Sequence, residues 1–185
     1  MKLRQAVLDL GVGMIGGYAG TKVMEQVSMK LYGLQSEETR KKEEEVRPGD
    51  PFYLAAEKTD RLLGLELSEE HLEKLATYGF HYGLGVGWGP TYTFLRRWTQ
   101  MGPVKAGLLS GAAMTVIVDE GLTPLMGFSA PNREYPLAAH LRGIAAHLAF
   151  GLGVAATAET IRWLGRIGKL DRFAWANDTI YLGTE

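Results

Sequence analysis

Hydrophobic and polar positions are unevenly spread along the 185 residues, because long uncharged stretches alternate with charged ones. Residues 75–95 contain no Asp, Glu, Lys or Arg over 21 positions, and residues 143–158 contain none over 16. Residues 106–118 and 10–21 are uncharged over 13 and 12 positions. A helix needs about 20 mostly apolar residues to cross the core of a bilayer. The predicted spans are residues 5–30, 72–96, 104–126 and 138–161, all approximate.

Glycine favours a membrane over water as the surroundings of these segments. The second one contains five glycines between positions 79 and 89. Each would destabilise a water-soluble helix by roughly 1 kcal/mol relative to alanine, and glycine weakens strands as well. Within lipid the backbone has no alternative partner, and glycine lets helices approach closely. Pairs four residues apart recur in three segments: Gly13/Gly17, Gly16/Gly20, Gly79/Gly83/Gly87, Gly85/Gly89 and Gly107/Gly111.

The fold class predicted from this pattern is all-α, a four-helix transmembrane bundle forming one membrane domain over residues 1–185. A charged, partly helical outer segment, about residues 35–71, separates the first two spans. Between residues 35 and 73 lie twelve of the 21 acidic residues and six basic ones, a net charge of −6. Asp50 and Pro51 predict a helix start, and Ser68 predicts another that continues into the second span. The run 37–45 is expected to extend the first span as a solvated helix.

The basic residues predict the topology. Cytoplasmic segments of membrane proteins carry an excess of Lys and Arg. The N-terminus, the link at residues 96–105 and the tail at about residues 165–185 are rich in these residues, whereas the short link at residues 121–136 has only Arg133. Trp98 and Trp163 fall at the same boundary, where aromatic anchors are expected. Both termini are therefore expected in the cytoplasm.

The N-terminal region has two other interpretations. Its basic start, apolar stretch and small residues near position 17 are typical of a signal peptide, but Asp9 interrupts the apolar stretch. Residues 11–16 match the dinucleotide fingerprint Gly-x-Gly-x-x-Gly. That fingerprint requires a preceding strand, and only a short charged segment precedes it here. Helix packing is the better interpretation of these glycines.

Composition excludes several classes of site. The chain has no cysteine, which excludes disulfides, thiolate metal sites and cysteine nucleophiles. Its formal charge of −1 argues against a nucleic-acid partner, because such proteins need a basic face.

Ionisable residues within the spans fall at one depth in this topology, in the outer half of the membrane. Such residues normally face the helix bundle and find partners there. This predicted polar cluster comprises Lys22, Glu25, His81, Asp119, Glu120, His140, Arg142 and His147.

Three roles are open for the cluster. It can be a structural network that joins the helices. It can bind a metal ion through Glu25, His81, Asp119 or Glu120, and His147, or a haem between His81 and His147, because bundle cores hold such sites. It can also pass protons or a solute across the membrane. No arrangement typical of nucleophilic catalysis is recognisable, which argues against an enzyme.

The second half of the chain resembles the YagU-like family of small bacterial inner-membrane proteins. The resemblance rests on AGLLSGAAMTVIVDEGLTPLMGFSAP, on His140 and on GIAAHLAFGL, and in the first half on GGYAGTKVMEQV and FHYGLGVGWGPTY. It implies a four-span protein of the bacterial inner membrane and leaves the activity open. The function expected from these observations is a non-enzymatic structural or accessory protein in the lipid bilayer, acting within a homo-oligomer or a larger membrane complex.

Overall fold

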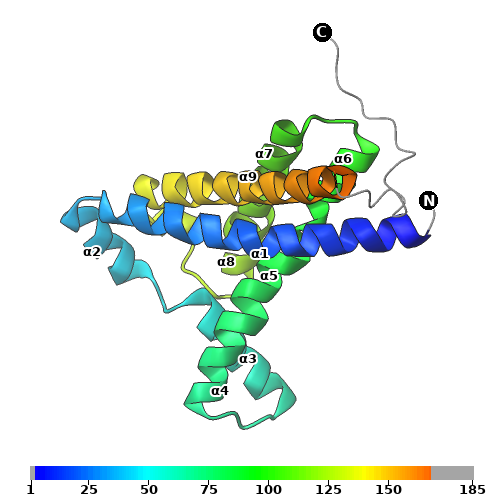
Figure 1. The fold of residues 1–185 in the computed structure, drawn as a ribbon. Coiled ribbons are helices and arrows are strands. Elements are labelled where there is room, and N and C mark those ends of the chain that lie inside the picture. The colour runs from blue at the N-terminus through cyan, green and yellow to red at the C-terminus, as the bar shows by residue number, and fades with distance from the viewer. Residues whose placement is uncertain (1–2, 168–185) are drawn as a thin grey trace.

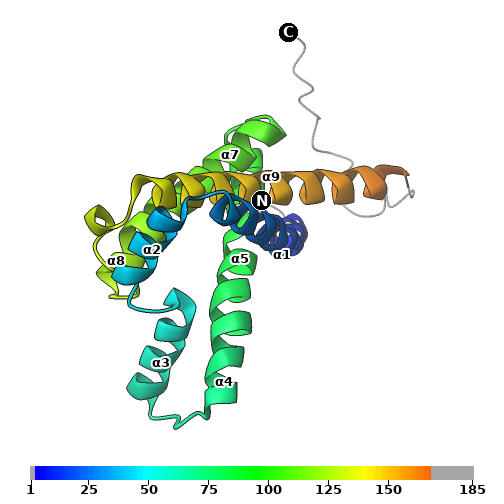
Figure 2. The ribbon, with the colours of Figure 1, turned by 90° about the vertical axis from the view of Figure 1, so that its left-hand side faces the viewer.

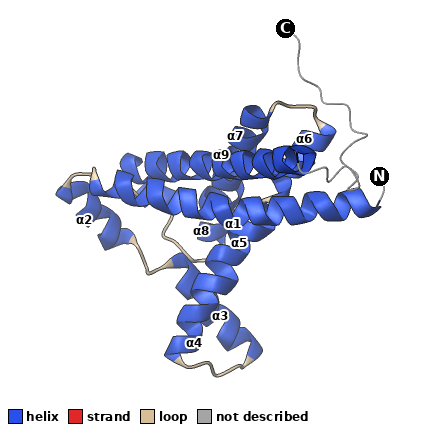
Figure 3. Ribbon diagram, viewed as in Figure 1, coloured by secondary structure: helices blue, strands red, loops and turns tan. Residues whose placement is uncertain are grey.

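A computed structural model describes residues 3–167, and this part of the chain consists of helices, turns and loops without any β-strand (Figure 3). The predicted all-α class is confirmed. Two segments, η1 and η2, are π-helical, and η3 is a short 3-10 turn. The elements in chain order are α1 (Leu3–Gly33), α2 (Glu37–Val46), α3 (Pro51–Leu63), α4 (Glu69–Lys74), η1 (Leu75–Tyr82), α5 (Gly83–Trp88), α6 (Pro90–Trp98), α7 (Pro103–Met114), η2 (Thr115–Leu122), α8 (Thr123–Leu125), η3 (Asn132–Glu134) and α9 (Leu137–Ile167).

The two longest helices, α1 and α9, lie side by side and antiparallel (Figure 1). Small residues on α1 let the two backbones approach closely. A Cβ atom added at Gly20 would lie only 2.7 Å from the carbonyl oxygen of Phe150, and one added at Gly16 only 3.1 Å from the Cγ1 of Val154. The predicted role of these glycines in helix packing is therefore confirmed for α1.

The second predicted span corresponds to the run from α4 to α6, and the third to the run from α7 to α8. The first run is interrupted in its hydrogen bonding at Gly89, because Pro90 has no N–H to donate. Both runs cross the α1–α9 pair (Figures 1 and 2). A core of buried apolar side chains lies where α1, α6, α7 and α9 meet: Val12, Tyr92, Ala106, Met114, Phe150, Val154 and Ala158, with others at its edge.

α3 packs against α4 and η1, and together they form a helical hairpin that projects from this core (Figure 2). One arm belongs to the outer segment and the other contains the start of the second predicted span, whereas α2 of the outer segment contacts α9. The predicted start of α3 is confirmed, because Asp50 Oδ1 accepts hydrogen bonds from the backbone N–H groups of Phe52 and Tyr53, each at 2.9 Å. Gly64 ends the helix in the left-handed conformation, with φ of 60°. Ser68 precedes α4 as predicted, but its hydroxyl contacts His71 Nδ1 at 2.7 Å instead of capping the helix.

One prediction about the outer segment was wrong. The run 37–45 does not extend the first helix. The chain turns after Gly33, and Ser36 caps the new helix α2 by accepting a hydrogen bond from the N–H of Thr39 at 3.2 Å. The helix is not solvated on all sides either, because Glu43 is buried against α9 by a pair of ionic contacts described below.

Within the described residues, two helical segments are long and apolar enough to cross a membrane by length and composition, Pro103–Leu125 and Leu137–Gly165. The first two predicted spans do not reach that level. Charged residues lower the hydropathy of α1, and tyrosine, histidine and glycine lower that of the run from α4 to α6. Length and hydropathy therefore support two candidate membrane spans among the described residues, and they do not establish a four-span arrangement.

Candidate functional site

Glu25 joins α1 to η1 through two neighbouring residues of the π-helix. His81 Nε2 lies 3.0 Å from Glu25 Oε1, and the Tyr82 hydroxyl donates to the same oxygen at 2.7 Å. The other oxygen, Oε2, accepts from Lys22 Nζ at 3.2 Å, and this ammonium also contacts the Tyr82 hydroxyl. The carboxylate is thus held by three side chains, two of them from another helix.

Asp119 joins η2 to α9 in a similar way. Its Oδ2 lies 3.2 Å from His147 Nδ1, which is also 3.0 Å from the carbonyl oxygen of Gly143. The His147 side chain is buried between the two helices. A Cβ atom added at Gly143 would lie 3.5 Å from Asp119 Oδ2, an ordinary van der Waals distance, so the contact does not require glycine at this position.

Glu120, the neighbour of Asp119, has a different partner. Its Oε1 lies 2.7 Å from His140 Nδ1, and the Nε2 of that histidine lies 3.0 Å from the carbonyl oxygen of Asn132. The Asn132 amide in turn donates to the backbone oxygen of Glu120 at 2.9 Å. This closed set fixes the loop between α8 and α9.

Arg142 connects α9 to α2, which the sequence did not indicate. Its two terminal nitrogens donate to the two oxygens of Glu43 at 2.7 and 2.6 Å, and Arg47 pairs with the same carboxylate. The Tyr32 ring covers the guanidinium, with 5.1 Å from its carbon to the ring centre. Burial by itself would raise the pKa of Glu43, but the bonds from Arg142 and the charge of Arg47 outweigh it, so the pKa lies below its ordinary value of 4.5.

The predicted polar cluster is therefore divided into separate pairs. His81, His147 and His140 each face a different carboxylate, those of Glu25, Asp119 and Glu120 respectively. Among residues 3–167, no group of three or more His, Cys, Asp or Glu side chains is placed to hold a metal ion. The candidate metal ligands are thus not brought together as the sequence suggested. What the described geometry provides is a set of inter-helix contacts.

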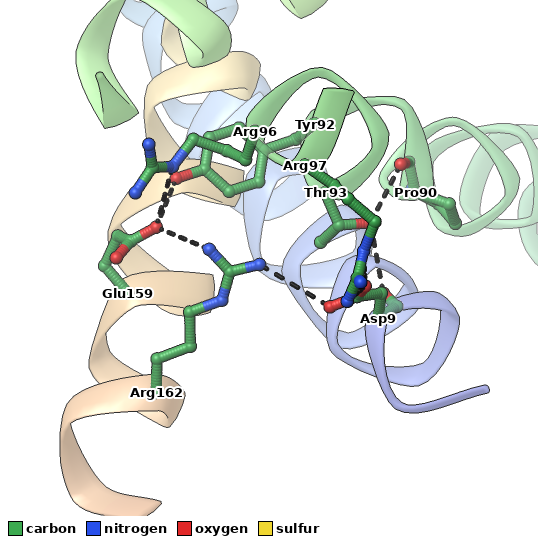
Figure 4. A network of polar contacts seen from close by, with 8 residues as sticks. All are labelled: Asp9, Pro90, Tyr92, Thr93, Arg96, Arg97, Glu159 and Arg162. Atoms are coloured by element: carbon green, nitrogen blue, oxygen red, sulfur yellow. Dashed lines mark hydrogen bonds and ion pairs between the residues drawn. The ribbon is translucent and has the colours of Figure 1, made fainter. Parts of the chain in front are cut away.

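A second polar network lies at the opposite end of α1, where α6 and α9 converge (Figure 4). Glu159 Oε1 accepts from the Tyr92 hydroxyl at 2.7 Å, from Arg162 Nη1 at 3.0 Å and from Arg96 Nε at 3.2 Å. Asp9 accepts from Arg97 Nε at 2.6 Å and pairs with Arg162 at 3.6 Å. Arg162 therefore bridges the two carboxylates.

The sequence did not indicate this network, because its arginines were expected only as flanking charges on the cytoplasmic side of the spans. The available signal was an acid near the predicted inner end of each terminal span, Asp9 and Glu159, because an acid within an apolar helix needs a partner. Thr93 completes the contact by donating to the backbone oxygen of Asp9 at 3.1 Å.

Comparison of the chain with family models, with curated proteins and with solved structures finds no match in any of the three. The resemblance to the YagU-like family therefore stays a prediction.

Proposed function

We propose that the protein is an integral membrane protein of four helical spans, located in a bacterial inner membrane with both termini in the cytoplasm, and that its role is structural or accessory rather than enzymatic. The observation that carries this proposal is the distribution of residues between surface and interior. In a water-soluble protein large apolar side chains fill the core. Here glycine, alanine and paired polar residues fill much of the interior, and large apolar side chains cover the outside.

The helix α1 illustrates this distribution although its hydropathy is modest. Leu3, Val7, Leu10, Met14 and Tyr18 follow one face at intervals of three or four residues, and each is between 41% and 80% exposed. The face turned to the other helices carries the glycines of the close contacts. Lipid tails solvate apolar side chains as well as a protein core does, so packing of small residues and paired polar groups holds such helices together.

Exposed apolar side chains continue on the two helices that are long and apolar enough to span. On the α7–η2 run these include Leu109, Val116 and Ile117, and on α9 they include Leu141 and Ile144. Large exposed apolar patches are rare on monomeric soluble proteins. We propose that a lipid bilayer covers these side chains.

The charges within the proposed spans favour a structural role. Ionisable residues in a membrane need partners inside the protein, and each acid described above has one or more. The metal- or haem-binding alternative requires His81 and His147 to act together with several carboxylates. Division of these residues into separate pairs favours the structural alternative.

Extraction of isolated membranes with alkaline carbonate tests this proposal. An integral protein stays in the membrane pellet, because carbonate removes only peripherally attached chains, and we expect the full-length protein in the pellet. Recovery in the supernatant would refute the membrane assignment. Blue native electrophoresis of the detergent-solubilised protein then tests the homo-oligomer or larger complex that we include in the proposal, and migration as a monomer would refute that part.

A further inference from the structure

Two helices far apart in the sequence share one residue pattern. Residues 13–25 and 107–119 both read Gly-x-x-x-Gly-x-x-x-Thr-x-x-x-acid, so that every position of the first has an equivalent 94 residues later. The acid is Glu25 in the first segment and Asp119 in the second. The threonines make the same local bond: Thr21 Oγ1 donates to the carbonyl oxygen of Gly17 at 2.9 Å, and Thr115 Oγ1 contacts that of Gly111 at 3.4 Å.

The two segments also bury the same positions. In the first, six of the ten residues from 12 to 21 are buried, and their equivalents in the second are buried as well. The remaining four are partly or fully exposed in both segments. The buried pairs are Val12/Ala106, Gly13/Gly107, Gly16/Ser110, Gly17/Gly111, Gly20/Met114 and Thr21/Thr115.

The helices that follow show a second repeat, with an offset of 66 residues. Residues 81–96 and 147–162 both read His-x-x-x-Gly-x-Gly-x-x-x-Thr-x-x-x-x-Arg. The histidine at the start of each pattern contacts the acid at the end of the preceding pattern, His81 with Glu25 and His147 with Asp119. An acid–histidine contact therefore occurs at the equivalent place in both copies, through Nε2 of His81 and through Nδ1 of His147.

The contacts between the repeats are equivalent too. A Cβ at Gly16 would approach Val154, and the equivalent pair is Ser110 and Trp88. Trp88 Nε1 donates to the backbone oxygen of Ser110 at 3.1 Å, so this second pair is also in contact. Both α1 and α7 meet α9 in the antiparallel sense, because Gly16 and Gly20 approach Val154 and Phe150, whereas Gly107 and Gly111 approach Gly151 and His147. The two helices therefore contact α9 with the same polarity, as a tandem repeat requires.

We infer that the chain contains two copies of one two-helix unit, related by a pseudo-twofold axis, and that each copy carries its own acid–histidine site. Residues 13–25 with 81–96 form the first unit, and residues 107–119 with 147–162 form the second. In a twofold arrangement, two equivalent residues can contact each other only where both lie close to the axis. Arg96 and Arg162 are equivalent, and both donate to Glu159 Oε1, at 3.2 and 3.0 Å. Glu159 therefore ties the two units together at their axis (Figure 4).

The copies differ in where they are π-helical. In the first unit the π-helical segment carries the histidine, and in the second it carries the acid. The contacts of the glycines differ by one turn: Gly85 packs against Gly17 and Thr21, whereas Gly151 packs against Gly107 and Gly111. Two diverged copies explain why two of the separate pairs, Glu25–His81 and Asp119–His147, occupy equivalent positions.

Moving the carboxylate of Glu159 to its equivalent position tests the inference. That position is Thr93, which precedes Arg96 by three residues just as Glu159 precedes Arg162. We expect Glu159→Thr to lower the melting temperature of the purified full-length protein. The double variant Thr93→Glu/Glu159→Thr should recover at least about half of that loss, because additive effects would leave the full loss in place. The matched control Thr93→Gln/Glu159→Thr lacks the charge and should recover none.

A folded double variant that is no more stable than Glu159→Thr would overturn the inference. Since Thr93 is buried, the double variant can fail to fold, and a saturation library of the full chain then decides. In this library the amount of folded protein measures how well each position tolerates substitution. The tolerance of residues 13–25 should match that of residues 107–119 best at the offset of 94, and that of residues 81–96 should match residues 147–162 best at the offset of 66. An equally good match when the segments are shifted by whole helical turns would overturn the repeat. Neither measurement depends on the membrane assignment, so that assignment can be refuted while the internal repeat still holds.

Discussion

The contact between Glu43 of α2 and Arg142 of α9 provides a sharp test of how the outer segment is attached. We predict that Glu43→Gln detaches α2 from the core while the rest of the fold persists. The carboxylate is only 1% exposed and receives two charged hydrogen bonds from Arg142, whose side chain is 12% exposed. The glutamine amide is neutral and offers one acceptor oxygen in place of two charged ones. The buried guanidinium of Arg142 therefore loses most of the negative charge that balances it.

The magnitude follows from the burial of both groups. Removing one partner of a buried ion pair typically costs 3–5 kcal/mol, because the other charge stays desolvated. For Glu43→Gln we use the lower end, about 3 kcal/mol, because Arg142 keeps its hydrogen bond of 3.0 Å to the side-chain oxygen of Gln35. At 1.4 kcal/mol for each factor of ten, opening of α2 becomes roughly 100-fold more frequent.

Hydrogen–deuterium exchange of the detergent-solubilised protein measures this opening directly. Amides of Glu37–Val46 should exchange roughly 100-fold faster in Glu43→Gln, with α7 and α9 little changed. The matched control is Glu45→Gln on the same helix, whose carboxylate is 64% exposed and whose pair with Lys41 is worth little. Equal exchange in α2 for the two variants would refute the reasoning.

The same contact has a defined pH dependence. Because the pKa of Glu43 is held below its ordinary value of 4.5, the carboxylate stabilises docking of α2 at pH values above 4.5. This contribution is lost as the pH falls through the lower folded value. Exchange of α2 amides, corrected for intrinsic rates, should therefore accelerate on acidification in the natural chain and much less in Glu43→Gln.

Three further predictions concern the packing, the outer hairpin and the metal or haem alternative. Gly111→Leu should destabilise the protein strongly in a thermal melt because its side chain would meet the α9 backbone, whereas Gly87→Leu, with open space around it, should not. The hydrogen bond to Glu69 raises the pKa of Tyr53 to about 12, so Glu69→Gln should lower the midpoint of its ultraviolet titration, and an unchanged midpoint would contradict the contact. Purified protein should be colourless and free of stoichiometric metal by elemental analysis, and a haem spectrum would contradict the structural role.

Local chemistry made much of the fold predictable. The uncharged stretches gave the positions of the long helices within a few residues, and Asp50 with Pro51 gave the start of α3, because an N-cap depends on a few neighbouring residues. The break before α2 was missed although Ser36, which caps α2, is a local signal for a new helix. The pairing of Glu43 with Arg142, 99 residues away, could not be predicted from local spacing.

The candidate site was predictable only in part for the same reason. The sequence placed Glu25, His81, Asp119 and His147 in one predicted cluster, because all four were expected at one depth, and the structure has them as two separate contacts. Expected depth alone cannot tell one shared site from two separate ones. That distinction depends on which face of each helix meets its neighbour. The spacing shared by residues 13–25 and 107–119 was present in the sequence and would have predicted two sites.

Accessibility of single cysteines in intact cells tests the four-span arrangement most directly, and the natural chain contributes no cysteine of its own. Cysteine at Glu66 or Arg133, both exposed on the proposed outer side, should react with a membrane-impermeant maleimide in cells whose inner membrane is intact. Cysteine at Gln100 or Lys105 should react only after that membrane is permeabilised. If only α7 and α9 crossed the bilayer, Glu66 would be protected together with Gln100. That result would contradict the four-span account.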